Sequence, residues 1–287
     1  MAAPIDFSVL GDVRARQDGH DLDPGTPQQQ AVLGLLLLRE GKLLLTEELI
    51  DQIWGSNPPQ TALCTARTYI CRLRRLFTGV GQGHSAILST SGGYCLPTDS
   101  HTLDLTVFQR CVQEARNARA AGDLARAATH LRTALSLWRG APLAGARGQY
   151  VQLERTRLEQ IHSNILEERI VLDLELGRHN ELIGELICLV NTYPLRERPY
   201  QLLMLALYRA GRQADALEVY REIRDLLNNE LGIDPGPDLR NLQQQILRSA
   251  PQLSSFTTKR QNLLAPYTAV PHPISPFTQS PPQLASA

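Results

Sequence analysis

The longest continuous pattern in the sequence is helical, because residues 103–249 form one Ala-, Leu- and Arg-rich amphipathic segment after another. A glycine separates two such segments at three places, and a small or apolar residue lies five positions after each glycine. The glycines are Gly122, Gly177 and Gly211, and the residues that follow them are Ala127, Leu182 and Ala216. Gly177 and Gly211 are 34 residues apart, which is the tetratricopeptide (TPR) period, although Gly122 precedes Gly177 by 55 residues. Glycine permits a tight turn, and a small residue lets the next helix pack closely. Residues 103–249 therefore predict an irregular, all-α, TPR-like domain.

Residues 1–98 alternate between strand and helix signals instead. Strands are expected at Ile5–Leu10, at Val13–Arg16 and around Leu22. Helices are expected at Gln28–Leu38 after the N-cap Thr26, at Glu47–Trp54 after the N-cap Thr46, and at about Thr61–Phe77. A β-hairpin with its turn near Gly92 is expected over Ile87–Leu96, followed by a linker over Pro97–Thr102. This order predicts an α+β winged helix-turn-helix domain at 1–98, in a chain that is mostly α overall.

The third of these helices carries the strongest functional signal. One face is an apolar stripe that we expect to be buried, made of Leu63, Ala66, Ile70, Leu73 and Phe77. The opposite face holds Thr61, Thr65, Thr68, Arg72 and Arg75, while Arg67 and Arg74 lie near one edge of the stripe and Tyr69 on its other flank. Residues 60–98 contain four basic residues and no acid, whereas residues 1–59 hold nine acids and four bases. Positive charge is therefore concentrated on this helix.

That combination of side chains suits the major groove of DNA. Arginine pairs with two acceptors of guanine, threonine offers a hydroxyl and a methyl group to base edges, and flanking arginines neutralise phosphates. An isolated Arg-Leu-Arg-Arg run is more often a solvated helix face. The preceding helices and the following hairpin favour DNA binding here, because together they make a helix-turn-helix with a wing.

No other motif indicates catalysis, a metal site or a cofactor. The five cysteines are odd in number and scattered, with no Cys-x-x-Cys pair, so buried free thiols are expected. The seven histidines form no zinc motif, and Gly79–Gly83 lacks the Lys-Ser/Thr of a phosphate-binding loop. We therefore expect a protein that is not an enzyme.

The two ends of the chain indicate a disordered segment and a cellular location. Residues 250–287 are rich in Pro, Ser, Thr and Gln and poor in charge, so we expect a disordered tail. The N-terminus has no signal-peptide pattern, and the longest apolar run is far too short to span a bilayer. A cytoplasmic protein is expected, without membrane contact.

Several segments resemble a known family. The segments Ile53–Gly55, Pro58–Pro59, Tyr69–Arg75 and Gly93–Tyr94 are similar to the OmpR/PhoB-type winged helix. The second half is similar to the bacterial transcriptional activation domain at Ala134–Leu143, Leu176–His179, Tyr193–Arg198, Met204–Arg212 and Glu230–Leu239. The two domains in this order, with no receiver or nucleotide-binding module, resemble the small form of the SARP family (Streptomyces antibiotic regulatory proteins). The resemblance covers about residues 5–248.

The resemblance implies a pathway-specific activator of a secondary-metabolite gene cluster. Its partners would be double-stranded DNA carrying direct repeats near a promoter, RNA polymerase, and a second copy of the chain on the adjacent repeat. Carried over by position, the base-edge readers would be Thr65, Thr68 and Arg72. The phosphate contacts would be Arg67, Arg74 and Arg75, the wing residues would be Thr90 and Ser91, and Tyr69 completes the surface.

Two other functions remain open from the residues alone. The helical-repeat domain could be a protein-binding scaffold that uses the winged helix as an interaction module, since helical repeats offer concave binding surfaces. The chain could also be a repressor, because physical reasoning does not separate repression from activation.

Overall fold

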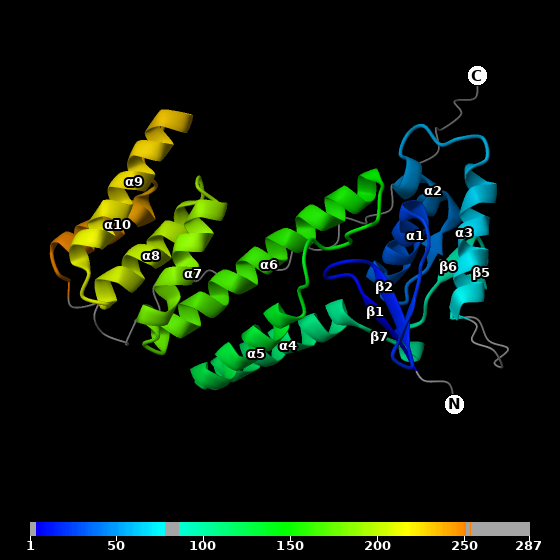
Figure 1. Ribbon diagram of the computed structural model, residues 1–287, viewed down its shortest axis with the longest axis horizontal. Coiled ribbons are helices and arrows are strands. Elements are labelled where there is room, and N and C mark those ends of the chain that lie inside the picture. The colour runs from blue at the N-terminus through cyan, green and yellow to red at the C-terminus, as the bar shows by residue number, and fades with distance from the viewer. Residues whose placement is uncertain (1–3, 78–85, 251–252, 254–287) are drawn as a thin grey trace, which may run out of the picture.

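The computed structural model describes residues 4–77, 86–250 and 253. Figure 1 shows an elongated molecule in which the N-terminal part, in blue and cyan, lies at one end and the later helices extend away from it. The predicted fold class is confirmed, because a small α+β region is followed by helices alone.

The N-terminal sheet contains one strand that the sequence did not indicate. Strands β1 (Ile5–Ser8), β2 (Arg14–Gln17) and β3 (His20–Leu22) pair antiparallel in sequence. Strand β7 (His101–Leu103) then pairs parallel with β1, which gives the order β3-β2-β1-β7. The expected linker 97–102 is therefore partly a strand. Three residues are too few to show a periodicity, and the partner strand lies far away in the sequence.

Three helices and a small sheet build the winged helix. They are α1 (Pro27–Leu38), α2 (Thr46–Trp54) and α3 (Ala62–Phe77). Thr26 caps α1 as expected, because its hydroxyl accepts from the Gln29 amide. Thr46 does not cap α2. Strand β4 (Leu44–Leu45) places Leu45 at the N-cap, and the Thr46 amide donates to the carbonyl of Gly92 at 2.9 Å.

The wing is the expected hairpin. Strands β5 (Leu88–Thr90) and β6 (Gly93–Cys95) pair antiparallel, and β6 also pairs with β4. Gly92 turns the chain with a φ of +89°. A Cβ atom at Gly93 would lie 2.3 Å from the Leu44 carbonyl oxygen, so only glycine lets β4 and β6 pair this closely.

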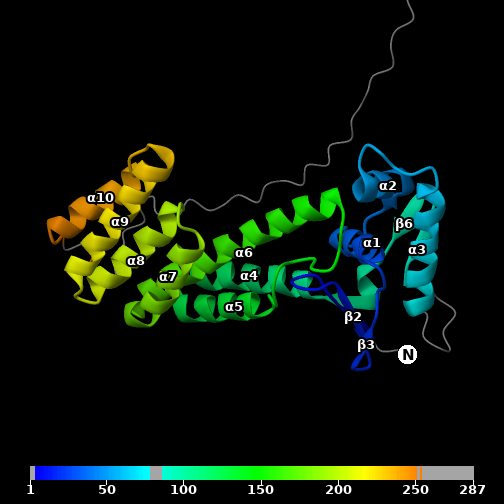
Figure 2. The same cartoon turned by 45° about the horizontal axis from the view of Figure 1, so that its top comes forward.

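Seven helices follow β7 in the described part of the chain. They are α4 (Asp104–Ala120), α5 (Leu124–Ser136), α6 (Gln149–Glu175), α7 (His179–Thr192), α8 (Glu197–Arg209), α9 (Gln213–Leu231) and α10 (Pro237–Leu247). The three glycine turns are confirmed, with φ of +83°, +80° and +77° at Gly122, Gly177 and Gly211. The residue five positions after each glycine is buried, as the packing argument expects. Figure 2 shows α4 and α5 running alongside α6.

Two hydrophobic clusters meet on α6. The first runs from Ile5 to Leu172 and joins both sheets of the winged helix to α4, α5 and α6. The second runs from Ile170 to Leu253 and holds α7 to α10 together. Leu253 is buried, and its carbonyl oxygen accepts from Arg209 at 2.9 Å, so this part of the expected disordered tail packs on the body. Residues 251–252 and 254–287 of that tail lie outside the described residues.

Within the described ranges, no helix combines the length and hydrophobicity needed to span a bilayer.

Candidate nucleic-acid interface

Helix α3 buries a stripe that differs from the expected one at a single position. Ala66, Ile70, Leu73 and Phe77 are buried as expected. Leu63 is 42% exposed, and Ala62, at 4%, takes its place in the core. Residues three and four positions before Ala66 both fit a 3.6-residue period, so spacing alone could not choose between Leu63 and Ala62. The packed structure places the smaller residue inside.

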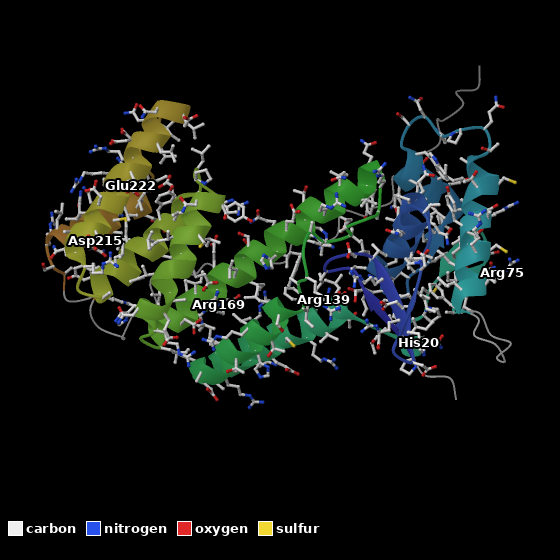
Figure 3. All side chains as sticks on the ribbon, in the orientation of Figure 1. His20, Arg75, Arg139, Arg169, Asp215 and Glu222 are labelled. Atoms are coloured by element: carbon white, nitrogen blue, oxygen red, sulfur yellow. The ribbon has the colours of Figure 1, made fainter. Side chains whose placement is uncertain are left out.

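The outward face of α3 has a clear midline. Cys64, Thr68, Cys71 and Arg75 recur at spacings of 4, 3 and 4 residues, and all four are exposed. At about 100° per residue they form one line along the helix, opposite the buried stripe. Figure 3 shows the Arg75 side chain on the side of α3 that faces away from the rest of the molecule. This midline is the part of α3 that would enter a groove first.

The flanks of the midline carry the other predicted site residues. Arg72 is exposed and Thr65 is half-buried on one flank, and Arg67 is exposed on the other. On the wing, Thr90 and Ser91 are exposed at the hairpin turn. Most of the expected residues are therefore exposed, either on the outward side of α3 or at the turn of the wing.

Two of the predicted residues also hold the site together. The Arg74 guanidinium donates to the Ile87 carbonyl at 2.9 Å and to the Ser89 hydroxyl at 2.7 Å, which fixes the wing against α3. The Tyr69 hydroxyl donates to the side-chain oxygen of Gln28 at 2.8 Å, which ties α3 to α1. Both side chains position the surface, and Arg74 is only half-exposed.

The electrostatics of this surface differ from those of the adjacent sheet. In the described part of the chain, Arg67, Arg72 and Arg75 take part in no salt bridge. By contrast, Arg14 and Arg16 of β2 pair with aspartates. Residues 60–98 contain no acid, so neither α3 nor the wing offers a carboxylate to these three guanidinium groups.

Cysteine placement corrects the sequence-based expectation of buried thiols. Cys64, Cys71 and Cys188 are exposed and Cys95 is partly exposed, so that only Cys111 is buried. Burial raises the pKa of the Cys111 thiol. The period that revealed the arginines also passes through Cys64 and Cys71, but cysteine is usually a buried residue and was assigned to the core for that reason. Cys64 and Cys71 therefore belong to the exposed face of α3, where the sequence did not place them.

Among the residues that the structure describes, no three His, Cys, Asp or Glu side chains lie close enough together to hold a metal ion.

The helical domain is hydrogen-bonded to the segment that follows β1. The Asp104 carboxylate, at the start of α4, accepts from the amides of Val9 and Leu10 at 2.9 and 3.1 Å. The loop between α5 and α6 pairs with the same segment, since the amides of Arg139 and Leu143 donate to the carbonyls of Leu10 and Val9 at 2.8 and 2.9 Å.

Helix α2 also contacts the helical domain, at the start of α6. A Cβ atom at Gly55 would lie 2.8 Å from the Gln149 side-chain oxygen, and one at Gly148 would lie 3.5 Å from the Ile53 carbonyl. Both glycines therefore lie where the end of α2 packs against the start of α6.

Comparison with known proteins gives two family matches that follow the same order. Residues 24–96 match the family described as transcriptional regulatory protein, C terminal, and residues 103–247 match the bacterial transcriptional activator domain. Together the two matches cover both halves of the described fold.

Relatives with both halves are bacterial regulators. Regulatory protein DnrI of Streptomyces peucetius is 37% identical over 254 residues, which cover 86% of this chain and 93% of that protein. Regulatory protein AfsR of Streptomyces griseus is 48% identical over 253 residues, which cover 88% of this chain and 26% of that protein. The chain thus spans about a quarter of the length of AfsR.

A solved structure agrees with these matches. Mycobacterium tuberculosis EmbR, in a structure described as a complex with a low-affinity phosphopeptide, superposes with a TM-score of 0.80 at 34% identity. The match covers 86% of this chain and 65% of the EmbR chain. With an OmpR/PhoB-type winged helix, a bacterial transcriptional activator domain and these relatives, the chain belongs to the family of Streptomyces antibiotic regulatory proteins, which are transcriptional regulators.

Proposed function

We propose that the chain is a sequence-specific DNA-binding activator of transcription whose helix α3 lies in the major groove. The observation that carries this proposal is the acid-free outward face of α3, where Arg67, Arg72 and Arg75 are exposed and have no salt-bridge partner among the described residues. Guanidinium groups in this setting bind phosphates and pair with guanine. A protein-binding scaffold gives no reason for such a face.

The residues divide by their place on this surface. Thr65, Thr68 and Arg72 contact base edges, as the family resemblance implies, and Arg67 contacts phosphate. The resemblance implied a phosphate contact for Arg75, but because Arg75 is exposed on the midline we propose a base-edge contact for it instead. Arg74 is hydrogen-bonded to the wing, and it contacts phosphate from that position.

At the hairpin turn, Thr90 and Ser91 approach the backbone of the neighbouring groove, as the resemblance implies for wing residues. Tyr69 orients α3 through α1.

The two halves of the chain take different roles in this proposal. Residues 1–98 bind direct repeats near a promoter, with a second copy on the adjacent repeat, and residues 103–249 recruit RNA polymerase. Family membership supports a secondary-metabolite gene cluster as the target and the bacterial cytoplasm, on the nucleoid, as the location. Because one hydrophobic cluster spans both halves, the second half also holds the first in place.

Electrophoretic mobility shift with the full chain tests the DNA-binding step. The probes are the promoters next to the protein's own gene, followed by footprinting of any that shift. The triple variant Arg67→Ala, Arg72→Ala, Arg75→Ala should bind much more weakly, and the slope of log K against log salt should flatten by about 0.9 for each phosphate contact removed.

A matched control removes three exposed arginines from the helical domain, namely Arg110→Ala, Arg116→Ala and Arg240→Ala. It should bind DNA as the unmodified chain does. Equal loss in both triple variants would show that general positive charge, and not the α3 surface, causes binding.

A further inference from the structure

Two exposed cysteines on the α3 midline need an explanation, because cysteine is among the most frequently buried residue types. Cys64 and Cys71 are both exposed and lie seven residues apart on one line of the helix. At 1.5 Å of rise per residue their Cα atoms are roughly 10 Å apart. A disulfide needs Cα atoms within about 7 Å, so these two thiols cannot bond to each other.

The rest of the midline is also weakly polar. The Thr68 hydroxyl donates to the Cys64 carbonyl at 2.8 Å, so its hydrogen is used inside the helix. Thr68 is left with a methyl group and acceptor lone pairs, and a cysteine thiol behaves as a small hydrophobic group with a weak donor. Along the midline, Arg75 is therefore the one strong hydrogen-bond donor.

The major groove contains one apolar group that such a surface fits. Base edges there present donors and acceptors, and thymine alone adds a 5-methyl group. A polar base edge pressed against a thiol would lose water without gaining a good partner. We propose that Cys64 and Cys71 are specificity residues that contact thymine 5-methyl groups when α3 lies in the groove, an inference that rests on the proposed DNA-binding function.

The spacing of the side chains gives the target a pattern. A recognition helix enters the major groove at an angle, and two helical turns of a zinc-finger helix read three successive bases. The two cysteines, roughly 10 Å apart, therefore reach positions about two to three base pairs apart, and Arg75, four residues beyond Cys71, reaches about one to two base pairs further. The recognised site therefore has thymines, on either strand, at two positions about two to three base pairs apart, with a guanine for Arg75 about one to two base pairs beyond the second.

Deoxyuridine substitution tests this directly, because uracil lacks the methyl group but keeps every hydrogen-bonding atom of thymine. The full chain first selects its site from a random duplex library. Each thymine of the selected site is then replaced singly by deoxyuridine, and affinity is measured by mobility shift. Two positions, about two to three base pairs apart, should each lose about three- to fivefold in affinity, as expected for losing one buried carbon group. The remaining positions should change little.

Serine variants connect each methyl group to its cysteine. Cys64→Ser should abolish the deoxyuridine effect at one of the two positions, and Cys71→Ser should abolish it at the other. Cys188→Ser, at an exposed cysteine of α7, is the matched control and should leave both effects intact. Cognate DNA should also protect Cys64 and Cys71, but not Cys188, from alkylation by N-ethylmaleimide.

The possible outcomes separate this inference from the function on which it rests. Sequence-specific binding with no effect of deoxyuridine at any position would overturn the methyl contacts and leave the DNA-binding function standing. Cysteine variants that weaken binding equally on thymine and deoxyuridine sites would overturn them as well. Failure of the full chain to select any duplex would overturn both proposals.

Discussion

Asp104 is the residue whose loss should best reveal how the two halves of the chain depend on each other. It is the first residue of α4, and its two carboxylate oxygens accept from the Val9 amide at 2.9 and 3.1 Å and from the Leu10 amide at 3.1 Å. Val9 and Leu10 are completely buried. In Asp104→Ala, two buried N–H groups lose their acceptor.

The expected loss of stability in Asp104→Ala follows from the two buried N–H groups. An unsatisfied buried N–H costs about 1–3 kcal/mol, and removing a carboxylate that is costly to bury offsets part of the loss, so we expect the free energy of unfolding to fall by about 2–4 kcal/mol. At about 2–4 °C per kcal/mol, the midpoint of thermal unfolding should drop by roughly 5–15 °C. Asp104→Asn keeps one acceptor oxygen and should lose only about 1 kcal/mol.

The pH dependence gives a second, independent readout. Burial raises the pKa of Asp104, against the lowering effect of the amides that it accepts from. The Asp104 carboxylate is therefore protonated at a higher pH in the folded protein than in the unfolded chain. The contribution of this raised pKa to the free energy of unfolding is fully present below the unfolded pKa and is lost as pH rises through the folded pKa. The stability difference between the unmodified chain and Asp104→Asn should thus widen as pH falls through the folded pKa toward the unfolded pKa.

Circular dichroism at 222 nm during heating, at several pH values, measures all three proteins. The reasoning is wrong if Asp104→Ala unfolds within about 1 °C of the unmodified chain, since that would mean that the two amides find other partners at no cost.

The other predictions concern packing, a buried charge and pH. Gly93→Ala should destabilise the wing by more than about 3 kcal/mol, because its Cβ atom would overlap the β4 backbone. Gly184→Ala in α7 has open space around the added Cβ atom and should stabilise the protein by up to about 1 kcal/mol. Urea unfolding measures the free energy of unfolding of both variants. Asp173→Ala leaves the buried Arg169 of α6 without one of its carboxylate partners and should lower the free energy of unfolding by about 3–5 kcal/mol. Asp215→Ala removes a carboxylate from an exposed ion pair and should lower it by less than about 1 kcal/mol in the same assay. Burial lowers the pKa of His162, so its contribution to stability is present above the unfolded pKa and is lost as pH falls through the folded pKa. His162→Phe should reduce that acid sensitivity in thermal unfolding, and an unchanged pH profile would contradict the assignment.

Local signals in the sequence were enough to predict most elements of the fold. The glycine turns of the helical domain and the wing hairpin each depend on a few adjacent residues, and both lie where the pattern places them. Strand β7 and the Asp104 contact depend instead on residues more than ninety positions away. A three-residue strand has no periodicity of its own, so its pairing with β1 could not be read from the sequence.

The candidate site divides in a similar way. The helical period identified the outward arginines of α3 because charged side chains are rarely buried. The same preference misled the assignment of Cys64 and Cys71, since cysteine is usually found inside. Arg74 is a different case, because its contacts with the wing require the hairpin to be folded before they exist.

Helix α6 has a mechanical consequence for the whole molecule. Its 27 residues span roughly 40 Å, with the helix-turn-helix at one end and the second hydrophobic cluster at the other. As a lever arm of that length, it would turn a rotation of about 5° at the Gly55 and Gly148 contacts into a displacement of roughly 3 Å at the far end. A substitution that rotates α6 against α2 would therefore move the distal helices relative to α3, with the surface of α3 itself unchanged.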